Sequence, residues 1–117
     1  MNATISDSSN VLINTARAYK RAIALLNEAT VCVNQATALA KEADAAFSLA
    51  AAKHGEARDA LRLPVGLFRW LGLFYHAEII ASTAARKLRL SRRLFRNAEK
   101  LKARAAVHGA ATLRPGN

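Results

Sequence analysis

Small apolar residues recur at every seventh position through most of this chain, and this repeat restricts the folds that it can adopt. Between residues 18 and 50, three heptad positions, conventionally g, a and d, are apolar at all fifteen of their sites. Such a repeat predicts an amphipathic α-helix that packs on another helix with a left-handed twist. The d position is always alanine, which allows helix axes to approach toward the short end of the usual range of about 8 to 10 Å. We call this helix-packing seam the alanine row: Ala22, Ala29, Ala36, Ala43 and Ala50.

Local signals set the expected limits of this first helix. A cluster of good N-cap residues over 6–10 predicts that the helix begins near residue 10. It is expected to span residues 10–62, because Leu-Pro-Val-Gly at 63–66 pairs a proline that disfavours helix before it with a glycine that permits a turn. Gly55 is a candidate kink, and a break near Gly55 or earlier would give a three-helix monomer as the alternative to assembly.

The same repeat returns after the predicted bend at 63–66. We expect a second helix over residues 67–108, with Gly109 just past its end and a tail over 109–117. Lys87 and Lys102 are polar at g and a positions, where their long side chains can snorkel to solvent. The d positions of this half continue the small-residue pattern: Ala77, Ala84, Ser91, Ala98 and Ala105.

The predicted fold is all-α: a long antiparallel helical hairpin of two heptad-patterned helices, forming one domain over residues 1–117. Two helices cannot cover apolar faces that are three heptad positions wide, so an isolated hairpin would leave an apolar stripe in water. We therefore expect a homo-oligomer, or docking on another helical protein, to complete a helical bundle.

Charge is concentrated in the second half of the chain. Of the net charge of +10, residues 1–63 contribute seven Lys and Arg against six Asp and Glu, whereas residues 64–117 contribute eleven against two. Six of these cations, spaced by three or four residues, fall on one helix face and repel one another by a few tenths of a kcal/mol per pair. This favours an anionic partner: nucleic acid, a lipid surface or an acidic protein. We call these six residues the basic stripe: Arg86, Arg89, Arg93, Arg96, Lys100 and Arg104.

The helix over residues 67–81 is apolar on nearly every side, so protein or lipid must cover it. Three interpretations stay open: burial by neighbouring subunits and the first helix, docking of a partner, or membrane contact. Charged residues interrupt the segment and it is shorter than the ~20 apolar residues of a membrane span, which favours an interfacial helix over a transmembrane one. Its aromatic residues form what we call the apolar docking tip: Phe68, Trp70, Phe74 and Tyr75.

No pattern typical of a catalytic, cofactor-binding or metal-binding site is present in the sequence, and we do not expect an enzyme. Cys32 is the one cysteine and falls at a core position, where it is expected to pack as a small apolar residue. The first ten residues lack Lys and Arg and do not resemble a secretory signal peptide. We therefore expect an intracellular protein, cytoplasmic by default or held within a larger particle such as a virion.

The preferred functional hypothesis is a non-catalytic structural or adaptor protein that assembles through its alanine-rich heptad faces and binds an anionic partner through the basic stripe. The first alternative is a nucleic-acid-binding protein that does not read sequence, since no Asn or Gln except Asn97 accompanies the arginines and the aromatics lie elsewhere. The second alternative is a peripheral membrane protein anchored by the apolar docking tip.

Overall fold

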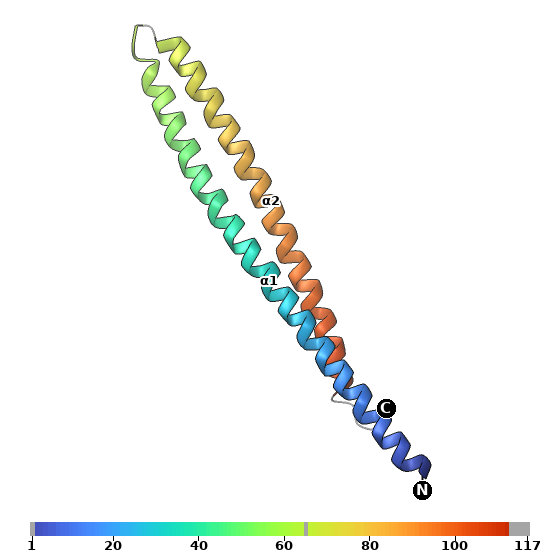
Figure 1. Cartoon of the computed structure of the whole chain (residues 1–117). Helices are drawn as coiled ribbons and strands as arrows, with labels where there is room; N and C mark the ends of the chain where they lie inside the picture. Colours follow the sequence, from blue (N-terminus) through green and yellow to red (C-terminus); the bar gives the residue numbers. More distant parts are fainter. Residues whose placement is uncertain (1, 65, 113–117) are drawn as a thin grey trace. The chain divides into compact units, whose positions relative to one another are not determined.

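The computed structural model describes residues 2–64 and 66–112, with side chains described for residues 8–64 and 66–110. Two helices account for most of these residues: α1 (Asn2–Ala60) and α2 (Gly66–Thr112). The described residues contain no strand. The prediction of an all-α helical hairpin is therefore confirmed (Figure 1).

The chain divides into two compact units, each containing a segment of both helices. We call Gln35–Arg93 the turn unit, and Met1–Asn34 together with Leu94–Asn117 the terminal unit. Within each unit, the α1 segment and the α2 segment lie side by side (Figure 1). The expectation of a single helical domain over residues 1–117 stays a prediction.

The helix limits differ from those predicted. The predicted start near residue 10 is wrong, because α1 begins at Asn2 and the N-cap cluster over 6–10 lies inside it. The predicted end at 108 is also wrong: Gly109 is helical, and α2 continues to Thr112, while residues 113–117 of the predicted tail lie outside the described residues. A helix ends where a strong helix breaker stops it. A single Gly destabilises a helix by only about 1 kcal/mol relative to Ala, so Gly109 does not end α2.

The helix α1 is continuous through Gly55, so the alternative of a three-helix monomer is wrong. A Cβ built on Gly55 would meet nothing within 4 Å, which indicates that this glycine is not required by close packing. An isolated Gly in a helix interior is tolerated at a modest cost, and the long heptad face on either side of it outweighs that cost.

The turn between the helices lies in the turn unit and follows the predicted bend closely. After Ala60, the amide of Leu63 donates to the Ala60 carbonyl at 3.1 Å, and the amide of Gly66 donates to the Leu63 carbonyl at 3.1 Å. Pro64 occupies the second position of this four-residue turn, where its fixed φ is favourable. Val65, the remaining residue of the predicted bend, lies outside the described residues.

In the turn unit, the helices are held together along their d positions. Ala36, Ala43 and Ala50 of α1 are buried, as are Ala77 and Ala84 of α2, several of them with no exposed surface at all. The hydroxyl of Ser91, which takes the place of an alanine in this row of α2, donates a hydrogen bond of 2.7 Å to the Ala36 carbonyl. A side-chain hydroxyl that reaches a helix backbone on the opposite helix requires the two backbones to lie close together, as small residues allow.

In the terminal unit, the packing also centres on small residues, with larger apolar side chains added. Ala22 and Leu25 of α1 form a buried cluster with Ala105 of α2, and the partly buried Leu101 packs against it. Ala29 and Ala98 are buried as well. The d positions therefore form the core in both units, as the heptad pattern indicates.

Candidate functional site

The basic stripe is exposed along its whole length. In the turn unit, α2 presents Arg86, Arg89 and Arg93 to solvent. In the terminal unit, α2 presents Arg96, Lys100 and Arg104 in the same way. None of the salt bridges among the described residues includes a member of the stripe. The stripe cations therefore repel one another by about 0.2 to 0.5 kcal/mol per neighbouring pair, and a bound anion would relieve this repulsion.

Two lysines beside the stripe do find carboxylates. In the turn unit, Lys87 Nζ lies 3.2 Å from Glu42 Oε2 across the two helices. In the terminal unit, Lys102 Nζ lies 3.5 Å from Glu99 Oε1 on the same helix. Both pairs are partly exposed, so each contributes about 0 to 1 kcal/mol to stability. These carboxylates partner the flanking lysines and leave the charge of the stripe unneutralised.

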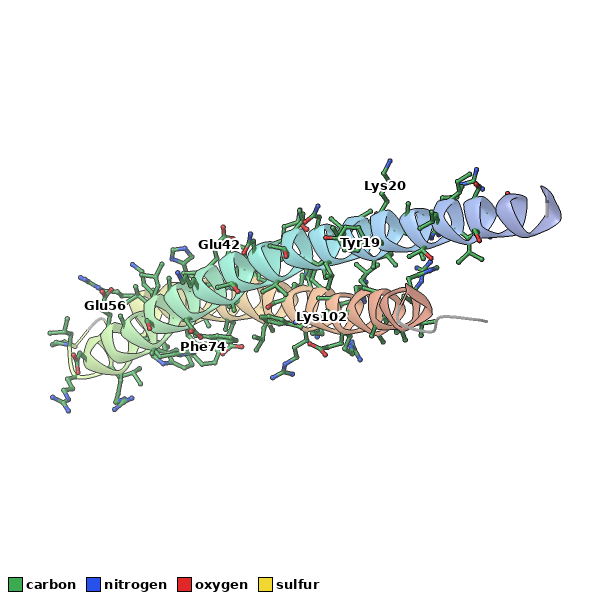
Figure 2. The ribbon with its side chains drawn as sticks, turned by 90° about the horizontal axis from the view of Figure 1, so that it is seen from below. Tyr19, Lys20, Glu42, Glu56, Phe74 and Lys102 are labelled. Atoms are coloured by element: carbon green, nitrogen blue, oxygen red, sulfur yellow. The ribbon has the colours of Figure 1, made fainter. Side chains whose placement is uncertain are left out.

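The terminal unit contains a cationic feature that the sequence reasoning missed. An open groove of about 570 Å³ is lined by residues of both helices. Lys20 is one of the lining residues. Its side chain projects outward from α1 (Figure 2). The sequence carried a partial signal, since three cations fall within five residues of α1, but the fourth comes from the stripe on α2. We call this site the basic groove, and its lining residues are Arg17, Lys20, Arg21, Ala24, Leu25, Glu28 and Arg104.

The apolar docking tip lies in the turn unit and is largely uncovered. Phe68 is 85% exposed and Tyr75 is 68% exposed, so the first helix does not bury them. Trp70 and Phe74 are more protected, and their rings stack with centroids 5.5 Å apart. Burying a large apolar side chain contributes about 1.5 to 3 kcal/mol, so the tip offers substantial binding energy to a partner.

One histidine of α1 contacts the tip from the facing helix. The His54 ring packs edge-on against Phe74, with centroids 5.2 Å apart. The same ring places Nε2 at 3.3 Å from Glu78 Oε1. The pairing across the two helices depends on their register, which the sequence does not give directly.

All five residues of the alanine row are buried, Ala22 and Ala29 in the terminal unit and the other three in the turn unit. The row is therefore used by the hairpin itself and is not free to receive a partner. Large apolar residues at neighbouring heptad positions remain in solvent, and they are the side chains that a partner helix would meet. They include Tyr19, Leu26, Phe47, Phe74 and Phe95.

Among the described residues, no three His, Cys, Asp or Glu side chains gather in a way that could hold a metal ion. Cys32 is a free thiol at a half-buried position. Neither described helix contains a stretch that is both long and apolar enough to span a bilayer. Comparison of the chain with protein-family models, curated proteins and solved structures found no match.

Proposed function

We propose that this chain is a non-catalytic structural or adaptor protein that packs its exposed apolar surface on other helices and binds an anionic partner on the basic stripe. This proposal rests on the observation that the contact between the two helices is narrower than their apolar faces. Alanines at d positions hold the hairpin together, while aromatic and aliphatic side chains beside them stay in solvent. Apolar surface of this extent on a soluble monomer is unusual and marks an interaction surface.

The exposed apolar residues occur in both units, which favours an extended contact over a single anchoring point. In the terminal unit Tyr19 is 60% exposed, and Ile23 and Leu26 beside it are also exposed. In the turn unit, Leu67, Phe68, Phe74 and Tyr75 are exposed. A second copy of the hairpin offers the same apolar side chains and would complete a four-helix bundle.

Sedimentation equilibrium at micromolar concentration tests the assembly. The unmodified chain is expected to sediment with a mass of more than one copy. The double variant L26Q/F47Q removes two exposed apolar side chains beside the seam and should shift the chain toward monomer. The matched control A45Q/A52Q places glutamines at exposed sites on the outer side of α1 and should leave the mass unchanged.

A stable monomer of the unmodified chain under these conditions would contradict self-assembly. Circular dichroism of each variant establishes that the helices remain folded. The anionic partner is tested separately with R89Q/R93Q, which removes two stripe cations of the turn unit. This variant should release an acidic ligand that co-purifies with the native protein and should keep the assembly state.

A further inference from the structure

We propose that the basic groove of the terminal unit binds the phosphodiester backbone of a nucleic acid, without reading its sequence. This inference rests on the anion-binding half of the proposed function and assigns the class of partner. The groove brings Arg17, Lys20 and Arg21 of α1 together with Arg104 of α2. Four cations against the single carboxylate of Glu28 leave a site with a net positive charge.

The side chains in the groove match phosphate chemistry. Three of the four cations are arginines, whose planar guanidinium groups can donate two parallel hydrogen bonds to phosphate oxygens. Arg17 and Arg21 are four residues apart, about 6 Å along the helix axis, so they can contact neighbouring anionic groups of one polymer. Among the described residues, these four cations take part in no salt bridge.

A continuous polyanion fits the terminal unit better than a small anion does. Arg104 belongs both to the groove and to the stripe, and Lys100 and Arg96 continue the line of exposed cations along α2. A phosphodiester chain carries regularly spaced charges and can follow such a line out of the groove. The groove is lined by no aromatic, Asn or Gln side chain, so contacts to base edges are not expected.

A lipid surface fits the groove less well. Peripheral membrane proteins place exposed apolar anchors on the same face as their cations. The apolar lining of the groove is Ala24, which is small, and Leu25, which is buried in the core of the terminal unit. Neither side chain can insert into a bilayer, and a concave site is poorly matched to a plane of headgroups.

Fluorescence anisotropy with the full chain tests this proposal, using a labelled DNA duplex of arbitrary sequence in NaCl from about 50 to 200 mM. The variant R17Q/R21Q removes two groove cations that lie outside the stripe. Each lost phosphate contact should reduce the slope of log affinity against log salt by about 0.9, so the slope should fall by about 1.8 in this variant. The variant should then lose roughly tenfold less affinity than the unmodified chain over this salt range.

The matched control is R58Q/R62Q, which removes the same charge from exposed arginines of the turn unit that lie outside both the groove and the stripe. Equal slopes of log affinity against log salt in R17Q/R21Q and R58Q/R62Q would contradict the assignment of the groove as the binding site, since they would indicate a general effect of net charge. The same conclusion follows if the unmodified chain binds vesicles of phosphatidylserine and phosphatidylcholine but no DNA duplex or single strand. Circular dichroism verifies that each variant is folded.

The stripe variant R89Q/R93Q separates this inference from the proposed function. If R89Q/R93Q weakens DNA binding and R17Q/R21Q does not, the groove assignment fails while the anionic-partner proposal stands. If R17Q/R21Q weakens binding beyond its control, the groove is supported whatever the stripe contributes.

Discussion

Gly66 is the residue at which the turn unit tolerates no side chain. A Cβ built on Gly66 would overlap the carbonyl oxygen of Ala60, the last residue of α1. The overlapping atom belongs to the backbone, so it cannot move aside as a flexible side chain would. The first residue of α2 is therefore a glycine for a steric reason, and the close approach of the two helix ends depends on it.

We predict that Gly66→Ala destabilises the hairpin, by at least about 1 kcal/mol, because the turn must open to admit the methyl group. Gly72→Ala is the matched control, since a Cβ at Gly72 meets nothing within 4 Å. That change replaces Gly by the best helix former inside α2 and should raise stability by up to about 1 kcal/mol. Urea unfolding of both variants measures the difference, and similar midpoints would contradict the steric account.

The alanine row of α1 and the matching row of small residues on α2 hold each unit together. The residues of the alanine row are buried to between 0 and 8% exposure, and the matching row of α2 is buried equally well. Small side chains contribute little area each, so stability along the seam comes from close contact repeated over many turns. A bulky side chain in the row would push the backbones apart at that point.

Ala43→Leu is expected to destabilise the turn unit by about 1 to 3 kcal/mol, the usual cost of overpacking a close-packed core. Ala43 has no exposed surface, whereas Ala45, two residues later on α1, is exposed. Ala45→Leu adds the same atoms in solvent and should change stability by less than about 0.5 kcal/mol. Thermal unfolding followed by circular dichroism compares the two variants, and equal effects would argue against a tight seam at residue 43.

These elements differ in how far the sequence could predict them. The seven-residue repeat was enough to predict both helices and the buried rows, because periodicity reports directly on which face is covered. The bend was predictable from the proline and the glycine at 63–66. The helix ends were not predictable from capping residues alone. Residues 1–54 contain neither Gly nor Pro, so nothing stopped α1 from extending to Asn2 through the polar cluster.

The basic groove could not be derived from the sequence for a different reason. Arg17 and Arg21 lie near one end of the chain and Arg104 near the other, and the alignment of α1 with α2 decides whether they meet. Heptad positions give the face of each residue but not its partner along the opposite helix. The contact of His54 with Phe74 and Glu78 depends on the same alignment.

For the molecule as a whole, two kinds of surface respond to salt in opposite ways. In the proposed function, exposed apolar residues drive assembly, and the net charge of +10 opposes it because like-charged copies repel. In the same proposal, exposed cations bind an anionic partner, and salt would weaken that binding through screening and through competition by ions.

We therefore predict that adding sodium sulfate raises the average mass of the free protein in light scattering, because sulfate screens the repulsion and strengthens apolar contacts. The same salt should release a bound polyanion. The control is A45Q/A52Q, which should respond as the unmodified chain does. A mass that falls as salt rises would indicate that ion pairs between copies hold the assembly together instead.

Successive alanines of the row are identical, so sliding one helix along the other by seven residues would place each of them opposite an equivalent neighbour. Two features of the turn unit favour the observed alignment of α1 with α2. The connection from Ala60 to Gly66 is short and cannot lengthen unless part of a helix unwinds. The Ser91 hydroxyl also reaches the Ala36 carbonyl only when the two helices have this alignment. Lengthening the connection with a flexible insert would therefore allow the same two helices to settle in several offsets, each seven residues from the next.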